Sequence, residues 1–208
     1  MDAYRTIRGP AIAEFTERRS RFIGAAAPAA DEEEALAFIT RVKKERWDAR
    51  HNVSAFILDG GRLRRYSDDG EPQGTAGQPV LDVLAKEQLT GCALVVTRYF
   101  GGILLGAGGL VRAYSHAAKI AVDAAGTVWM QPCDQLELTC GYSLYGRLPA
   151  LIAELDGEVD DTVFAEGVTL RFHLPAERTA AFQTRLNDLS AGSLTAERIG
   201  AACYPQEK

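Results

Sequence analysis

The stretch Cys92–Tyr99 (CALVVTRY) is followed by a glycine-rich segment, FGGILLGAGG, at residues 100–109 and by LVRAYSHAAKIAVDAA at residues 110–125. The first stretch is apolar and contains β-branched residues, which predicts a buried β-strand. The third has apolar residues at helical spacing, which predicts a long helix with one face in the core. A strand, a glycine-rich loop and a helix thus follow one another, as in a mixed α+β protein.

The chain before this stretch contains signals for both strands and helices. A charged turn at residues 17–19 separates two extended segments, and Asp59-Gly60-Gly61 is a strong turn signal between two more. An Asp-Glu-Glu-Glu sequence precedes apolar residues at helical spacing, which favours a helix start. The predicted elements are a hairpin (8–17 and 20–27), a helix (31–47), a second hairpin (52–58 and 63–67), a turn-rich loop (68–79) and a helix (79–86).

The chain after residue 134 has a different pattern. Its elements, in order, are a strand (136–140), a helix (145–155), two strands (159–164 and 168–174), a helix (176–189) and a strand (194–199). This βαββαβ order is that of a ferredoxin-like domain. We therefore predict an α+β fold with two domains, residues 1–130 and 131–208, that meet near residues 126–134.

Composition narrows the class of protein. The 208 residues, 47% of them hydrophobic and 25% charged, suffice for one large or two small domains. No apolar run approaches the ~20 residues of a membrane span, and no secretory signal is visible, so we expect a cytoplasmic protein with no membrane partner. The four cysteines, Cys92, Cys133, Cys140 and Cys203, form no Cys-x-x-Cys pair, which argues against disulfides and a zinc site.

Charge is distributed unevenly along the chain. Residues 1–130 carry 17 basic and 16 acidic side chains, whereas residues 131–208 carry 6 and 12. The net charges are +1 and −6, which sum to the overall −5. A polyanionic partner would therefore contact the N-terminal domain and be repelled by the C-terminal one.

The glycine-rich segment is the first candidate site. Backbone N–H groups at a helix start form an anion site, and glycines let a phosphate approach the backbone. The alternative is that these glycines permit tight turns and close packing of the helix on the strand. The segment matches neither a Walker A loop nor G-x-G-x-x-G. The candidate phosphate-binding residues here are Gly101, Gly102, Gly106, Gly108 and Gly109.

An acidic segment provides the second candidate. Asp68, Asp69 and Glu71 could hold Mg²⁺, or one of them could act as a general base. Alternatively, they form local turns and helix caps.

A third candidate is a basic surface. Arg50, His51, Arg98 and Tyr99 could contact phosphate groups, with aromatic rings available for stacking on bases. The alternative is that arginines on strand faces are simply solvated.

Four segments together resemble the IMPACT family, in particular its bacterial, YigZ-type members. They are Ser20-Arg21-Phe22, the Ala-Arg-His-Asn sequence at 49–52, the acidic segment at 67–77 and the Arg-Tyr-Phe-Gly-Gly segment that starts at residue 98. The resemblance covers the whole chain. It implies an N-terminal domain similar to the second domain of small-subunit ribosomal protein five and a C-terminal ferredoxin-like domain, a pair similar to the last two domains of elongation factor G. One departure is Arg50, where many relatives have threonine.

The resemblance implies a link to translation through association with nucleic acid or the ribosome. We therefore expect a non-enzymatic protein that binds RNA or the ribosome through phosphate contacts of its N-terminal domain, without a cofactor or a metal. The alternative is an enzyme that holds a nucleotide or phosphorylated metabolite on the glycine-rich loop and Mg²⁺ on the acidic segment. A third hypothesis is a protein-interaction module that uses the C-terminal sheet. The sequence leaves the oligomeric state open.

Overall fold

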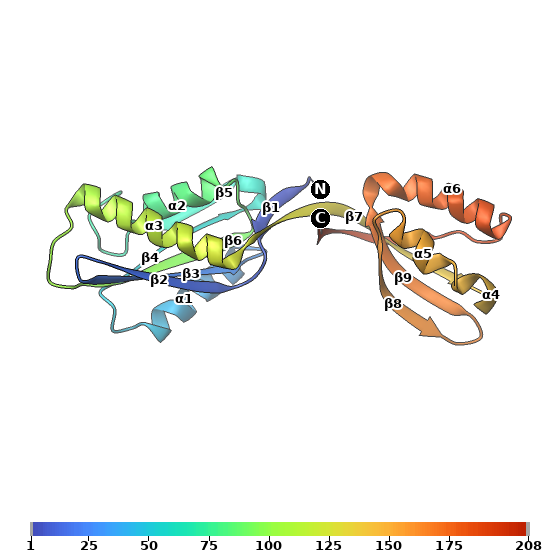
Figure 1. The fold of residues 1–208 in the computed structure, drawn as a ribbon, viewed down its shortest axis with the longest axis horizontal. Helices are drawn as coiled ribbons and strands as arrows, with labels where there is room; N and C mark the ends of the chain where they lie inside the picture. Colours follow the sequence, from blue (N-terminus) through green and yellow to red (C-terminus); the bar gives the residue numbers. More distant parts are fainter. Residues whose placement is uncertain (1, 207–208) are drawn as a thin grey trace. The chain divides into compact units, whose positions relative to one another are not determined.

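A computed structural model describes residues 2–206 of the chain. They form two compact units, one of Tyr4–Trp129 and one of Met130–Gln206 together with residues 2–3 (Figure 1). The units divide one residue before the predicted boundary, and both combine helices with a sheet. The predicted mixed α+β, two-domain fold is confirmed. Within residues 2–206, every helix is too short or too polar to cross a lipid bilayer.

The N-terminal unit is built on a five-stranded antiparallel sheet of order β2-β3-β6-β4-β5. Both predicted hairpins are present in it. A tight turn with positive φ at Arg18 and Arg19 joins the first, and a 3₁₀ turn (Asp59–Gly61) joins the second. The strands are β2 (Ala11–Glu17), β3 (Ser20–Pro28), β4 (His51–Leu58), β5 (Leu63–Ser67) and β6 (Cys92–Tyr99).

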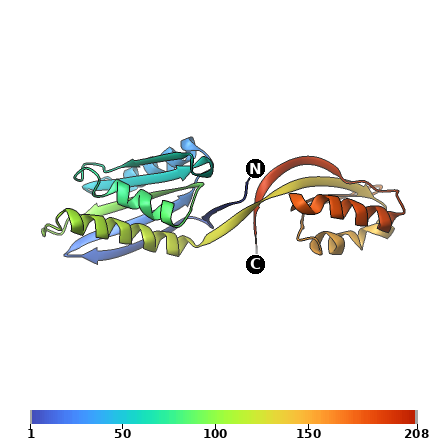
Figure 2. The same ribbon diagram turned by 90° about the horizontal axis from the view of Figure 1, so that it is seen from above.

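Helices cover both faces of this sheet. Helix α1 (Glu32–Glu45) packs on one face, and α2 (Gly77–Lys86) and α3 (Ala107–Ala125) pack side by side on the other (Figures 1 and 2). Alternation along β3 explains the two cores, because Ala25 and Ala27 contact the α1 side while Phe22 and Ala26 contact the α3 side. Gly24 lets α3 approach, since a Cβ there would lie 2.5 Å from the carbonyl oxygen of Ala117.

Local chemistry sets the helix starts. Asp31 caps α1 by accepting a hydrogen bond from the Glu34 amide at 2.9 Å, and the Glu34 carboxylate accepts one from the Ala30 amide. Helix α3 begins at Ala107, three residues before the predicted start at residue 110. Gly106, with a φ of 70°, is the residue that turns the chain into the helix.

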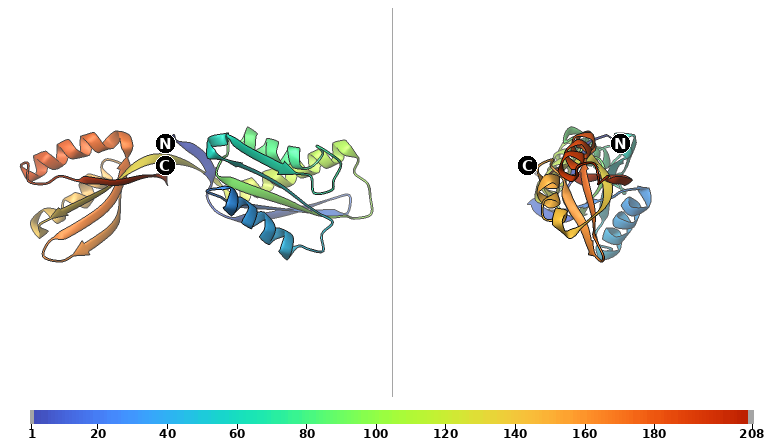
Figure 3. Two further views of the ribbon diagram at one scale, coloured as in Figure 1. Left: turned by 180° about the vertical axis from the view of Figure 1, so that it is seen from behind. Right: turned by 90° about the vertical axis from the view of Figure 1, so that its right-hand side faces the viewer.

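The C-terminal unit has the ferredoxin-like arrangement. Its antiparallel sheet has the order β10-β7-β9-β8, and β1 (Tyr4–Ile7) also pairs with β7. The core includes Phe172 and Phe182, whose ring centroids lie 5.0 Å apart. The elements are β7 (Thr127–Cys140), α4 (Tyr142–Tyr145), α5 (Leu148–Ala153), β8 (Glu158–Phe164), β9 (Val168–Pro175), a 3₁₀ turn (Ala176–Arg178), α6 (Thr179–Ser190) and β10 (Glu197–Pro205). Figure 3 shows this unit, coloured yellow to red, from behind.

Four elements differ from the prediction. The segment expected to separate the domains, residues 126–134, belongs mostly to strand β7, which pairs with β10 along its polar part. In place of the predicted helix at 145–155 the chain forms two short helices, α4, which ends at Tyr145, and α5, whose first turn contains Pro149, a residue tolerated only at a helix start. Strand β10 begins and ends later than the predicted strand at 194–199, and β1 was not predicted.

Candidate functional site

Four connections of the N-terminal unit lie at the same end of its sheet, which we call the distal end. Strand pairing places them there, since His51 at the start of β4 lies opposite Arg98 near the end of β6, and Tyr99 lies opposite Arg21 near the start of β3. The connections are the β2–β3 turn (17–20), the α1–β4 segment (46–50), the β5–α2 loop (68–76) and the β6–α3 loop (100–106). The distal end therefore gathers the candidate residues of all three motifs.

The α1–β4 segment is anchored to the end of β6. Arg46 donates to the Thr97 hydroxyl at 3.2 Å, and its carbonyl accepts from the Asn52 amide group at 3.3 Å. The Tyr99 hydroxyl donates to the Asp48 carboxylate at 2.9 Å. Lost solvation and this hydrogen bond both raise the pKa of Tyr99, so it remains a donor at neutral pH. Tyr99, predicted to contact phosphate, thus holds the segment in place.

The anchored segment presents a ring and a cation to solvent. Trp47, the last residue of the helix predicted at 31–47, lies beyond the end of α1 with 82% of its surface exposed. Arg50 is exposed, and so are Lys44 in the last turn of α1 and Arg19 in the β2–β3 turn. The side chains of Arg19, Lys44 and Arg50 have no polar partner among residues 2–206. The sequence pattern identified Arg50 but not Lys44 or Trp47.

Arg98 is not a surface cation. Its guanidinium Nη1 donates to the Glu71 carboxylate at 2.6 Å, and only 7% and 4% of the two side chains are exposed. The same Glu71 oxygen accepts from the Tyr114 hydroxyl at 2.8 Å, and His51 Nε2 lies 3.9 Å from it. Burial, and then the Glu71 charge, raise the pKa of Tyr114. Arg98 therefore lies inside the unit and not on its surface, and its contact with phosphate stays a prediction.

One nitrogen of this buried cluster lacks a partner. Arg98 Nε has no hydrogen-bond acceptor within the described part of the chain, although the guanidinium lies over the rings of Phe22 and Phe100 at 5.6 and 5.4 Å. Aromatic faces attract a guanidinium electrostatically. The cluster thus couples the β5–α2 loop to β6 and α3 inside the unit.

Asp68 is a helix cap. Its Oδ1 accepts from the amides of Ala76 and Gly77 at 3.1 and 2.8 Å, and its Oδ2 accepts from the Gly74 amide at 2.9 Å. The amides of Ala76 and Gly77 lie at the start of α2, where N–H groups have no partner within the helix, and the Gly74 amide lies in the loop just before it. Asp68 therefore has the local capping role that was the alternative to metal binding.

The other two carboxylates of the acidic segment are also engaged. The Asp69 carboxylate accepts from Lys43 Nζ at 2.7 Å and from the Asn52 backbone N–H at 2.6 Å, and the Asp69 carbonyl accepts from His51 Nδ1 at 2.8 Å. Glu71 is bound by the buried cluster described above. Over residues 2–206, His, Cys, Asp and Glu side chains nowhere gather in threes that could hold a metal ion. The geometry does not favour the Mg²⁺ site of the enzymatic alternative.

The glycine-rich loop is shaped by backbone packing. A Cβ on Gly101 would lie 2.0 Å from the carbonyl carbon of Arg19, and the Gly101 amide donates to the Ser20 hydroxyl. Gly102 and Gly106 have φ values of 85° and 70°, which glycine adopts without strain. Both features agree with the alternative that these glycines permit tight turns and close packing. Phosphate binding by the loop stays a prediction.

The rest of the predicted loop differs in two respects. Gly108 and Gly109 belong to the first turn of α3, not to the connection before it. Within the loop, Phe100 and Leu104 expose apolar surface, 80% of it in the case of Leu104. The loop therefore offers backbone and apolar groups to a ligand, and its cations come from neighbouring elements.

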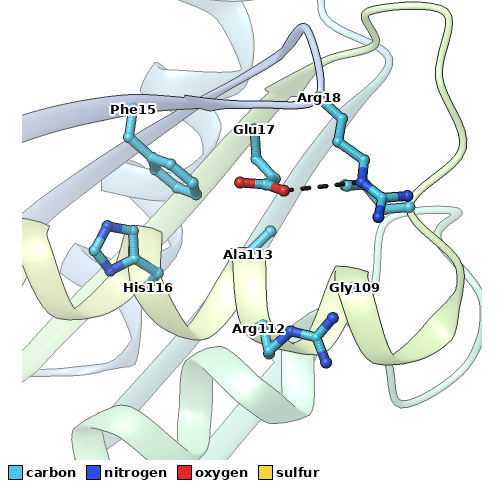
Figure 4. Close-up of a pocket in the computed structure, with 8 residues that line it drawn as sticks. Phe15, Glu17, Arg18, Gly109, Arg112, Ala113 and His116 are labelled. Carbon is cyan, nitrogen blue, oxygen red and sulfur yellow. Dashed lines mark ion pairs between the residues drawn. The ribbon is translucent and has the colours of Figure 1, made fainter.

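A cavity of about 260 Å³ lies beside this loop, between the end of β2 and α3. Figure 4 shows Arg18 and Arg112 at one end of it and Phe15 and His116 at the other. Sequence reasoning missed all four residues. Arg112 and His116 are four residues apart on the helix that follows the glycine-rich segment, and this spacing could have indicated these two residues.

Comparisons with known proteins agree with this architecture. Residues 18–122 match the Impact N-terminal domain, and residues 138–193 match a domain of unknown function, DUF1949. The chain belongs to the IMPACT family. The first match contains every candidate residue of the distal end, and the second lies within the ferredoxin-like unit.

Relatives of the family are similar along most of their length. The IMPACT family member YigZ of Escherichia coli (strain K12) is 39% identical over 180 residues, which cover 85% of this chain and 88% of the relative. The IMPACT family member YvyE of Bacillus subtilis (strain 168) is 34% identical over 193 residues, covering 92% and 89%. A crystal structure of a hypothetical protein matches with a TM-score of 0.63 at 36% identity and covers 96% of this chain and 98% of that one.

Proposed function

We propose that this IMPACT family protein binds single-stranded RNA through the distal end of its N-terminal unit and acts in translation without catalysing a reaction. The observation that carries the proposal is an exposed tryptophan beside exposed cations that lack partners. Trp47 and Arg50 lie on the anchored α1–β4 segment, Lys44 precedes them in the last turn of α1, and Arg19 in the β2–β3 turn adds a third cation. Stacked bases and neutralised phosphates are the two contacts by which proteins bind single strands.

The charges of the N-terminal unit support an RNA-binding surface at the distal end. Many arginines of the N-terminal unit are neutralised in place, as Arg21 is by Glu14, Arg65 by Glu32 and Arg98 by Glu71. Arg19, Lys44 and Arg50 at the distal end have no acidic partner among residues 2–206, whereas the C-terminal unit carries an excess of acids. A polyanion would therefore be drawn to the distal end.

The acidic segment argues for binding rather than catalysis. A general base or a metal ligand needs a carboxylate that can reach a ligand. Asp68, Asp69 and Glu71 each bind a protein group instead, and together they fix the loop that borders the distal end. Their role in the proposal is to hold the surface in shape.

Fluorescence anisotropy with a labelled, mixed-sequence RNA that has a 5′-hydroxyl end tests the proposal. We expect binding by the full chain that weakens as salt is raised, because contacts to phosphates release counterions. The triple variant Arg19→Ala, Lys44→Ala, Arg50→Ala should bind weakly. Its plot of log K against log salt should be flatter by about 2, since each phosphate contact on a single strand contributes about 0.7.

The chain offers a matched control. Arg8, Lys86 and Arg147 are also exposed and have no polar partner among residues 2–206, but they lie outside the distal end. Changing these three to alanine removes the same charge and should leave the salt slope within experimental error. Equal losses from the two triple variants would mean that net charge, not the distal end, governs binding, and the proposal would fail.

A further inference from the structure

The cavity beside the glycine-rich loop has an excess of positive charge. Arg18 and Arg112 line it together with one carboxylate, Glu17, which lies 4.0 Å from Arg18 Nε. Arg112 is exposed and has no polar partner anywhere in residues 2–206. Two guanidinium groups and one carboxylate leave a net positive site, and the planar guanidinium fork matches the geometry of phosphate oxygens.

The remaining wall of the cavity is apolar and aromatic. Phe15 and Leu105 line it, and the ring of His116 meets the ring of Phe15 edge to face with centroids 4.6 Å apart. Phe15 in turn stacks on the buried Phe22 at 5.3 Å, which holds its position. A ligand that fits both parts of the cavity has an anionic end and a flat or apolar body.

We propose that this cavity binds the 5′-phosphate of a nucleotide, with the phosphate on Arg18 and Arg112 and the nucleoside against Phe15 and His116. Its volume of about 260 Å³ is close to the lower end of the ~300–1,000 Å³ of small-molecule sites, so the phosphate and part of the nucleoside fill it. The nucleotide comes from one of two sources, the 5′ end of an RNA or the free mononucleotide. The site uses none of the cations assigned to the RNA surface, so it stands independently of that proposal.

Isothermal titration calorimetry of the full chain with adenosine 5′-monophosphate, adenosine and inorganic phosphate tests the site. We expect the monophosphate to bind at least tenfold more tightly than adenosine, because only the phosphate contacts the guanidinium groups. We also expect it to bind more tightly than inorganic phosphate, which lacks the nucleoside. The variant Arg18→Ala, Arg112→Ala should lose at least tenfold in affinity for the monophosphate.

Both arginines are surface residues, so the double variant should remain folded, and Arg8→Ala, Lys86→Ala removes the same charge elsewhere as its control. A second variant, Arg112→Glu, should abolish binding by reversing one charge. Equal binding of adenosine and its monophosphate, or equal losses from the double variant and its control, would overturn the proposal.

A comparison of RNA ends distinguishes the two sources. If the ligand is an RNA end, 5′-phosphorylated RNA should bind several-fold more tightly than 5′-hydroxyl RNA, and the Arg18, Arg112 variant should lose this preference. If the monophosphate binds but the two RNAs do not differ, the ligand is the free nucleotide. If the monophosphate did not bind and the two RNAs did not differ, the site would be refuted. Binding of 5′-hydroxyl RNA, which tests the RNA surface, would not be affected by that result.

Discussion

Replacing Glu71 by glutamine tests the role that we assign to the buried cluster. The variant keeps the shape of the side chain but removes the charge that neutralises Arg98, whose side chain is 7% exposed. Removing one partner of a buried ion pair costs about 3–5 kcal/mol, because the other charge remains buried without compensation. For a unit of this size, that corresponds to a fall in Tm of about 10–20 °C.

An exposed ion pair provides the control for this prediction. Arg21 and Glu14 also form a close pair, but their side chains are 54% and 53% exposed. Glu14→Gln should therefore cost no more than about 1 kcal/mol. The two variants remove the same chemical group from the same unit, so their difference measures the effect of burial.

Hydrogen exchange followed by mass spectrometry is the suitable assay, because peptides from β6 and α3 report the opening of the N-terminal unit alone. A further variant, Glu71→Leu, Arg98→Met, Tyr114→Phe, replaces the cluster by apolar groups and should recover most of the lost stability. If these peptides were as protected from exchange in Glu71→Gln as in Glu14→Gln, Arg98 would not need the Glu71 charge to remain buried, and our account of the cluster would be wrong.

Three further predictions concern the loops and thiols. Asp68→Ala should lower the free energy of unfolding by about 1 kcal/mol, because the start of α2 loses its cap. Urea unfolding measures this change, and an unchanged midpoint would contradict the capping role. Gly101→Ala should lower the free energy of unfolding by about 3 kcal/mol, because the added Cβ would collide with the β2–β3 turn. Gly102→Ala should lower it by about 1 kcal/mol, because the added Cβ meets open space but the backbone has a positive φ. Equal losses in the two variants would refute the contact of Gly101. Burial raises the pKa of Cys92 to about 12, so at pH 8 its reactive thiolate is scarce, and iodoacetamide should label the partly exposed Cys203 first, as mass spectrometry would show.

The sequence predicted the elements that depend on local chemistry. The turn at Gly60, the helix start at Asp31 and the alternating or continuous apolar runs lie where the structure has them, because short-range sterics and periodicity determine such features. Strand β7 was missed in part because its polar stretch around Pro132 has no strand pattern of its own. It is a strand because β10 pairs with it, a long-range contact that the local sequence does not encode.

The candidate site was harder to predict because charge alone does not reveal burial. Arg98 follows Leu94 and Val96 at intervals of two, so strand alternation would have placed it on the same buried face. Its partner, Glu71, lies in a loop, and only the fold brings the two together. Whereas Arg98 is charged and buried, Trp47 is apolar and exposed. It lies at helical spacing in the sequence, but α1 ends before it.

The most direct test of the proposed function is ultraviolet cross-linking of the full chain to single-stranded RNA, followed by mass spectrometry of the cross-linked peptides. Our account predicts cross-links at the distal end, above all in the peptide that contains Trp47, and their loss in the Arg19, Lys44, Arg50 triple-alanine variant. The variant of Arg8, Lys86 and Arg147 should keep them. Cross-links confined to the ferredoxin-like unit, or unchanged in the first variant, would contradict the claim that the distal end binds RNA.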